Sequence, residues 1–185
     1  MLAVQASELG EYETAIGLWK RAIELNPNDA IAFLNISYAY MKQGNYEDAL
    51  ASSRRSMELD PAMKETTLNY AGSEFIVGDI KKTISILEKL LRKEPDYPPA
   101  MVLAGAAYYI DGQKEKSLEI FEKLRKKRFD CTEFFDEQIR ALMSQGRFPQ
   151  AFSLLEAAVK TESVNKDTKT LLAECHGKIG GKTEG

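Results

Sequence analysis

The chain of 185 residues is poor in the residue types on which most metal and catalytic sites depend. It has one histidine, His176, and two cysteines, Cys131 and Cys175, which lie 44 residues apart and form no Cys-x-x-Cys pair. A structural zinc site takes about four Cys or His ligands, and disulfide-dense scaffolds carry several cysteine pairs. No phosphate-binding glycine loop is found either. The sequence therefore predicts no metal and no cofactor. Its cysteine content favours a reducing compartment, and we expect a cytoplasmic protein.

Long apolar runs and a dominant charge are also absent. No run approaches the ~20 apolar residues of a membrane span, and the segment MLAVQASELG lacks the basic start of a signal peptide. The formal net charge is -3, from 25 basic and 28 acidic residues, which gives no reason to expect a nucleic-acid partner. The run Lys123–Arg128 is a local basic exception. We interpret it as a solvated helix end, with a patch for an acidic partner as the alternative.

Glycine is present at a fixed interval, and this repeat organises the chain. Gly10 and five further glycines lie 34 residues apart without a slip, at Gly44, Gly78, Gly112, Gly146 and Gly180. We number each repeat from its first to its thirty-fourth place, starting at Ala30, so that the glycine takes the fifteenth place. The twentieth place is always small, at Ala15, Ala49, Thr83, Ser117 and Ala151. Such a period is the signature of a repeat architecture.

Apolar residues spaced by three and four predict two amphipathic helices in each repeat. The glycine ends the first helix, where a left-handed residue is needed. The thirty-second place ends the second helix with a proline, at Pro27, Pro61 and Pro95, and this proline is replaced by Phe129 and Ser163 further on. No stretch shows the period of two that a half-buried strand requires. We expect helices at 2–9, 13–25, 30–43, 47–59, 64–77, 80–93, 99–111, 114–127, 132–145, 149–161 and 166–179.

The segment Ala30–Met63 resembles the tetratricopeptide repeat (TPR) through Ser37, Gly44, Tyr46, Ala49 and Pro61. The resemblance implies an all-α fold, a right-handed helical-hairpin solenoid (TPR superhelix) of about five repeats plus a C-terminal capping helix. We expect a single solenoid over 1–180 and a disordered tail at 181–185. The solenoid divides into a truncated first repeat at 1–29, full repeats at 30–63, 64–97, 98–131 and 132–165, and a capping helix at 166–180. Because Met1 falls in the middle of a first helix, we expect a chain cut from a longer one.

The resemblance also implies a binding site, since the first helix of each TPR lines a concave face. Carried onto this chain, the peptide-binding candidates are Asn35, Tyr38, Lys42, Asn69, Phe75, Tyr109, Glu133, Glu137 and Arg140. Asn35 and Asn69 are similar to the asparagine ladder of O-GlcNAc transferases, and each carboxamide could bind a peptide backbone. Two solvated asparagines are the alternative. For Phe75 an alternative stays open: it is a core residue if its helix is rotated about its axis. The basic residues of a TPR carboxylate clamp are missing.

Cys175 and His176 are neighbours, which raises the alternative of a nucleophile and its base. Adjacent helical residues point ~100° apart, so they are poorly placed to serve one substrate. Cys175 also occupies the tenth place, where Ala39, Ser73, Ala107 and Ala141 stand in the other repeats. A small buried residue therefore explains Cys175 better than catalysis does.

These observations predict a non-catalytic scaffold for protein–protein interaction. It would hold a peptide or partner protein in its concave groove, with Tyr38, Phe75 and Tyr109 as apolar anchors and with Glu133, Glu137 and Arg140 setting the charge preference. The alternative is the TPR part of a larger multidomain enzyme, such as a glycosyltransferase, with its catalytic domain outside this chain. Self-association through the open first repeat is a further alternative, because an unpaired repeat exposes an apolar face.

Overall fold

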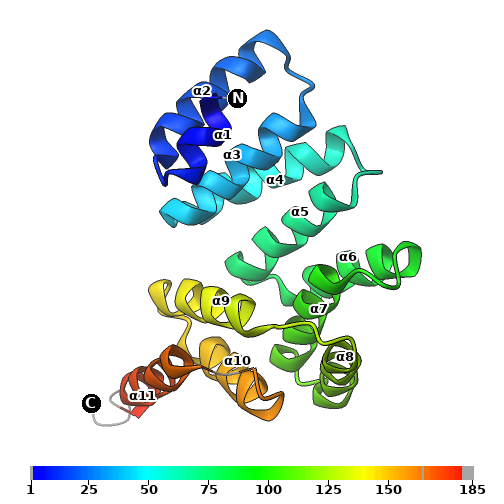
Figure 1. Cartoon of the computed structure of the whole chain (residues 1–185), viewed down its shortest axis with the longest axis vertical. Helices are drawn as coiled ribbons and strands as arrows, with labels where there is room; N and C mark the ends of the chain where they lie inside the picture. The colour runs from blue at the N-terminus through cyan, green and yellow to red at the C-terminus, as the bar shows by residue number, and fades with distance from the viewer. Residues whose placement is uncertain (1, 164, 181–185) are drawn as a thin grey trace. The chain divides into compact units, whose positions relative to one another are not determined.

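The computed structural model describes residues 2–163 and 165–180, and all regular secondary structure in these ranges is α-helix (Figure 1). The helices are α1 (Leu2–Glu8), α2 (Tyr12–Leu25), α3 (Ala30–Gln43), α4 (Tyr46–Leu59), α5 (Lys64–Val77), α6 (Ile80–Lys93), α7 (Pro98–Ile110), α8 (Lys114–Lys126), α9 (Thr132–Ser144), α10 (Phe148–Lys160) and α11 (Lys166–Gly180). Each expected boundary lies within one residue of the observed one. The predicted all-helical hairpin fold is confirmed, while the tail at 181–185 lies outside the described residues.

The helices group into two compact units, residues 1–86 and 87–185. In the first unit, each helix from α1 to α4 packs against the next one in the chain, and α3 also packs against α5. In the second unit, α7 packs against α8, α9 against α10, and α11 against both α9 and α10. Within this unit α10 also packs against α7. The continuous solenoid over 1–180 stays a prediction.

Helix ends follow the turn chemistry of the sequence. Gly44 ends α3 at φ 77° and Gly78 ends α5 at φ 107°, in the left-handed region that glycine adopts at little cost. The second helices end in two different ways. Asp60, which precedes Pro61, has φ -137°, whereas Arg128 has φ 56°. A following proline disfavours helical geometry in the residue before it, and Arg128 precedes Phe129 instead.

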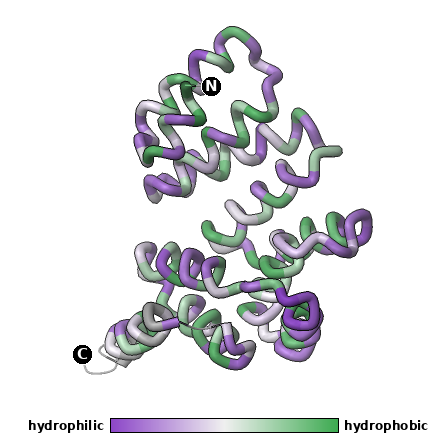
Figure 2. Tube along the Cα trace, viewed as in Figure 1, coloured by the Kyte–Doolittle hydropathy of each residue, from purple (hydrophilic) through white to green (hydrophobic). Residues whose placement is uncertain are grey.

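Small residues allow the paired helices to cross closely. All five residues in the twentieth place are fully buried: Ala15, Ala49, Thr83, Ser117 and Ala151. In the α7–α8 pair, Ser117 Oγ donates a hydrogen bond of 2.7 Å to the Gly105 carbonyl. A Cβ added to Gly105 would lie 2.8 Å from Phe121 Cζ. Figure 2 shows hydrophilic and hydrophobic residues mixed along most of the helices, as expected when one side of a helix is buried and the other faces water.

Neighbouring repeats also meet at a polar seam. We use this name for the contact of an eleventh-place residue with the twenty-fifth place of the preceding repeat and the nineteenth place of its own. In the first seam Lys20 Nζ lies 5.7 Å from the Tyr40 ring centroid. Hydrogen bonding to Tyr40 is the largest cause of the raised Lys20 pKa, and the charge of Asp48 is a smaller one. In another seam the Tyr108 hydroxyl donates to Glu88 Oε1 at 2.8 Å, and Lys116 Nζ lies 5.2 Å from the ring centroid.

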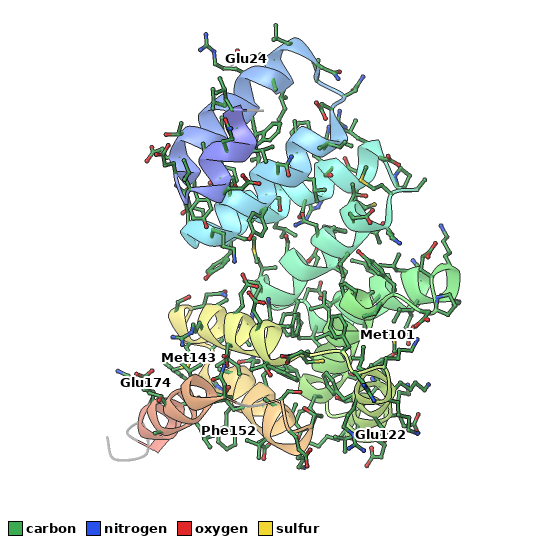
Figure 3. All side chains as sticks on the ribbon, viewed as in Figure 1. Glu24, Met101, Glu122, Met143, Phe152 and Glu174 are labelled. Atoms are coloured by element: carbon green, nitrogen blue, oxygen red, sulfur yellow. The ribbon has the colours of Figure 1, made fainter. Side chains whose placement is uncertain are left out.

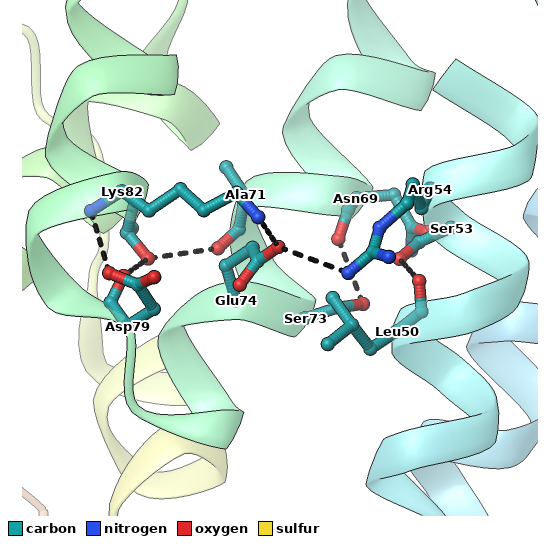
Figure 4. Close-up of polar contacts among 10 residues, drawn as sticks. Leu50, Ser53, Arg54, Asn69, Ala71, Ser73, Glu74, Asp79 and Lys82 are labelled. Carbon is teal, nitrogen blue, oxygen red and sulfur yellow. Dashed lines mark hydrogen bonds and ion pairs between the residues drawn. The ribbon is translucent and has the colours of Figure 1, made fainter. Parts of the chain in front are cut away.

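The middle seam buries a carboxylate. Glu74 on α5 is 3% exposed, and its Oε1 lies 2.7 Å from Lys82 Nζ and 3.9 Å from a guanidinium nitrogen of Arg54 (Figure 4). Both cations also approach the Tyr70 ring, Lys82 at 5.4 Å and Arg54 at 6.0 Å. Hydrogen bonding to Glu74 is the largest cause of the raised Lys82 pKa, followed by Tyr70. A buried charge is tolerated only when it is paired, and here α4 and α6 supply the pairing.

Candidate functional site on helices α3 and α5

Helix α3 presents a face that combines asparagine, tyrosine and lysine. Its start is fixed by Asp29, whose side chain accepts a hydrogen bond of 3.0 Å from the Ala32 backbone N–H. Asn35, Tyr38 and Lys42 follow at helical spacing and therefore share one side of α3. Tyr38 is 49% exposed, which is unusual for so large an aromatic ring, and Lys42 Nζ lies 5.1 Å from its centroid.

Helix α5 continues this face, since α3 and α5 pack together. Asn69 takes the same place in its repeat as Asn35, and its side-chain Oδ1 is buried without a hydrogen-bond partner among the described residues. One turn further on, Gly72 takes the place of Tyr38. We call Asn35, Tyr38, Lys42, Asn69 and Gly72 the α3–α5 face. It combines the unpartnered Asn69 Oδ1 on α5 with the exposed Tyr38 ring on α3.

Two of the predicted apolar anchors, Phe75 and Tyr109, are buried inside the fold. Phe75 is fully buried, so the open alternative of a core residue is the correct one for it. Tyr109 is 1% exposed, which makes its assignment as an exposed anchor wrong for this structure. Tyr109 is buried because α10 packs against α7. Lys160 Nζ on α10 lies 5.7 Å from the Tyr109 ring centroid, and Lys114 Nζ on α8 lies 5.0 Å from it.

The charged candidates lie on α9, in the second unit. Glu133, Glu137 and Arg140 are all exposed, at the helical spacing that puts them on one side of α9. The carboxylate of Asp136, on the same helix, is instead bound by α11 and the turn before it. Its two carboxylate oxygens accept hydrogen bonds of 2.6 Å from Asn165 Nδ2 and 2.7 Å from Thr168 Oγ1. The three exposed charges are therefore accessible, and their role stays a prediction.

The cysteines belong to the core. Cys175 is fully buried, as expected from its place in the repeat, and its thiol donates to the Phe148 carbonyl at 3.4 Å. Burial raises its pKa, and burial also raises the pKa of Cys131 to about 11, with the charge of Asp130 as a smaller cause. Both groups are thus protonated at neutral pH and poor nucleophiles. The side chain of His176 lies outside the described residues.

The basic run Lys123–Arg128 covers the end of α8 and the turn that follows it. Leu124 points into the core and is fully buried. Arg125 forms an ion pair of 2.9 Å with Glu122, which is labelled in Figure 3. Lys127 forms an ion pair with Asp96. Acidic partners within the fold therefore neutralise part of the run, which fits a solvated helix end.

Two further classes of site find no support in the part of the chain that the structure describes. No group of three or more His, Cys, Asp or Glu side chains there could hold a metal ion. Among the same residues, no helix combines the length and the apolar character that crossing a membrane demands.

Sequence reasoning missed the buried carboxylate of the middle seam. A signal was present, because the eleventh place holds Tyr40 and Tyr108 in the adjoining repeats and Glu74 between them. An acidic residue at a place that is aromatic on both sides predicts either a rotated helix or a buried ion pair. The structure has the ion pair, with Lys82 and Arg54.

Comparison with known proteins gives the family. Residues 7–44 match the TPR repeat profile, and residues 30–63 match the tetratricopeptide repeat profile. No curated protein sequence matches the chain significantly. A thermophilic TPR protein of Thermus thermophilus is similar in fold, at 22% identity and a TM-score of 0.62, with 94% of this chain and 95% of that chain covered. YrrB, a TPR protein with an unusual peptide-binding site, is similar at 14% identity and a TM-score of 0.62, covering 91% of this chain and 87% of that chain.

An enzyme is also among the similar structures. The O-GlcNAc transferase of Thermobaculum terrenum matches at 23% identity and a TM-score of 0.54, over 58% of this chain and only 21% of its own length. The fold is therefore found both in proteins that consist of TPRs and within a larger enzyme. Residues 7–63 are therefore tetratricopeptide repeats, and the helical pairs and these likenesses show that the chain has the fold of TPR proteins.

Proposed function

We propose that the chain is a non-catalytic interaction scaffold that holds an extended peptide of a partner protein on the α3–α5 face. The observation that carries the proposal is the buried Asn69 Oδ1, which has no donor among the described residues. An unpaired buried polar atom costs about 1–3 kcal/mol, and a ligand N–H would remove that cost. Rotation of the carboxamide would turn the group toward such a ligand.

The surroundings of Asn69 fit a peptide better than a small molecule. Asn35 lies at the equivalent place on α3, so two carboxamides can pair with successive main-chain groups of an extended chain. The exposed Tyr38 offers an apolar platform for one ligand side chain, and aromatic residues of this kind dominate binding energy at interfaces. YrrB, which has the same fold, has a peptide-binding site.

Removal of both carboxamides tests the proposal. Peptides selected from a random display library against the wild-type chain are measured by titration against an Asn35→Ala/Asn69→Ala variant. Two lost hydrogen bonds of about 1 kcal/mol each should weaken binding more than tenfold. An Asn28→Ala/Asn45→Ala variant, which changes exposed asparagines outside the α3–α5 face, should bind as the wild type does. Equal affinity of the first variant and the wild type would exclude this site.

The exposed charges on α9 have a proposed role in selecting ligands. Glu133 and Glu137 outnumber Arg140 there, which favours a basic ligand segment through long-range attraction. In that case, Glu133→Gln/Glu137→Gln should reduce the salt dependence of the association rate, and an unchanged salt dependence would exclude the role.

Two alternatives have support of their own. Likeness to the O-GlcNAc transferase structure favours a TPR part of a larger enzyme, and the complete reading frame around this chain decides that by the presence or absence of a catalytic domain. Self-association through the first repeat is favoured by the exposure of Leu2 and Val4 on α1 and of Leu9 in the turn after it. Light scattering of the purified chain distinguishes a monomer from a dimer.

A further inference from the structure

Gly72 lies in the interior of α5 for no reason that the fold supplies. A glycine inside a helix costs about 1 kcal/mol relative to alanine, so its presence calls for an explanation. Gly44 and Gly78 need positive φ values, but Gly72 has an ordinary helical φ. Gly105 needs its small size because of Phe121, but a Cβ added to Gly72 would meet no atom within 4 Å. Neither backbone conformation nor packing requires glycine at this position. The same holds for Gly17 in α2, and Gly72 differs from Gly17 in sharing its side of the helix with Asn69 on the α3–α5 face.

The position itself suggests the reason. Gly72 follows Asn69 by three residues and therefore shares its side of α5. It also stands at the ninth place of its repeat, where Tyr38 stands in the preceding one. The α3–α5 face thus has a protruding ring on α3 and a bare main chain on α5. The orphaned Asn69 Oδ1 lies one helical turn away from that bare main chain.

We propose that Gly72 forms a notch that admits the main chain of the bound peptide, which then runs between the α5 backbone and the Tyr38 ring. This inference rests on the proposed function and specifies its ligand: an extended segment whose main chain crosses α5 at Gly72, with a side chain packed on Tyr38. A helical turn advances ~5 Å and two extended residues advance ~6.6 Å, so one peptide N–H reaches Asn69 while a neighbouring residue crosses the notch.

A methyl group in the notch separates this role from a structural one. We expect Gly72→Ala to raise Tm by ~2–4 °C, because helix propensity improves and nothing is displaced. The same change should weaken binding of the library-selected peptides about tenfold or more, because the methyl occupies the space of the ligand main chain. Gly17→Ala is the matched control, since Gly17 lies inside α2, outside the α3–α5 face, and an added Cβ also meets nothing within 4 Å. It should raise Tm equally and leave binding unchanged.

Each result has a definite meaning. Higher Tm with weaker binding for Gly72→Ala, and higher Tm alone for Gly17→Ala, supports the notch. A lower Tm for Gly72→Ala overturns it, because glycine would then serve the fold. Unchanged binding by Gly72→Ala, together with lost binding by Asn35→Ala/Asn69→Ala, overturns the notch and leaves the proposed function standing. Unchanged binding by all of these variants, or a library that yields no binder, overturns both.

Discussion

At the scale of single residues, the size of one side chain decides whether two helices fit together. Gly105 and Phe121 illustrate this in the α7–α8 pair, where a Cβ on the glycine would lie 2.8 Å from the ring. Gly72 illustrates the opposite case, with open space beside it. The same residue type therefore has a packing role on one helix and a proposed binding role on another.

Gly105→Ala should destabilise the protein. The gain in helix propensity is at most about 1 kcal/mol, while overpacking against a buried ring costs ~1–3 kcal/mol. We expect a net loss of ~1 kcal/mol in the free energy of unfolding, measured by urea denaturation. Gly105→Ala/Phe121→Leu should cost less than the sum of its two single substitutions, because each relieves the other. A Gly105→Ala variant as stable as the wild type would show that the ring moves aside freely.

Tyr108 should make stability fall at alkaline pH. Burial, and then its hydrogen bond to Glu88, raise its pKa from 10.0 to about 12 in the folded protein. The unfolded state releases this proton between pH 10 and 12 while the folded state keeps it. The stabilisation is therefore complete below pH 10 and is lost as pH rises through this window, on the order of 1 kcal/mol per pH unit. Tyr108→Phe should show a flatter decline in chemical denaturation across the same range; parallel curves for the two proteins would contradict the assignment.

At the scale of helices, the middle seam joins α4, α5 and α6 through unequal partners. Glu74 is almost fully buried, whereas Arg54 and Lys82 keep more than a third of their side chains in solvent. Loss of a cation therefore leaves a buried charge short of a partner. Loss of the carboxylate leaves two cations that water can still solvate. We therefore expect the loss of a cation to destabilise the fold more than the loss of Glu74 does, although Glu74 takes part in both ion pairs and each cation in only one.

Lys82→Met should accordingly cost more than Glu74→Tyr. Removing one partner of a buried pair costs about 3–5 kcal/mol, and Arg54 at 3.9 Å would compensate for part of it. Glu74→Tyr restores the aromatic residue that Tyr40 and Tyr108 provide in the adjoining repeats, and we expect it to be within ~1 kcal/mol of neutral. Urea denaturation of the two variants measures both values. Equal losses would mean that solvent already reaches Glu74.

The helices themselves were predictable because their signals are local. Gly44, Pro61 and the spacing of apolar residues act within one or two turns, and every boundary follows from such signals. The face of each helix was less predictable, because neighbours decide it. Phe75 and Tyr109 were assigned to a binding face by their place in the repeat, yet both are buried. The α7 sequence is apolar on all sides, which indicates a helix buried all round, but it does not show that α10 is the helix that packs against Tyr109.

At the scale of the whole molecule, a strict period of 34 residues coexists with repeats that differ in their contacts. The candidate site could be predicted in part: Asn35, Tyr38 and Lys42 share one side of α3, and Asn69 continues it on α5. The notch at Gly72 required the structure, because only the surrounding space distinguishes it from Gly105. The buried Glu74 likewise required knowledge of which helices approach it.

The polar seams also bear on how such an array can grow by internal duplication. A second copy of 30–63 placed in tandem would bring the original Arg54 against the new Tyr40, with Asp48 beside it, which is the charge combination of the first seam. A second copy of 64–97 would bring Glu88 against the new Glu74, so that two carboxylates would share one lysine, Lys82. Like charges oppose each other, and the opposition is strong where one of them is buried, as Glu74 is. The seams therefore restrict internal duplication. The repeat 30–63 can be duplicated in tandem unchanged, whereas duplication of 64–97 requires a compensating substitution.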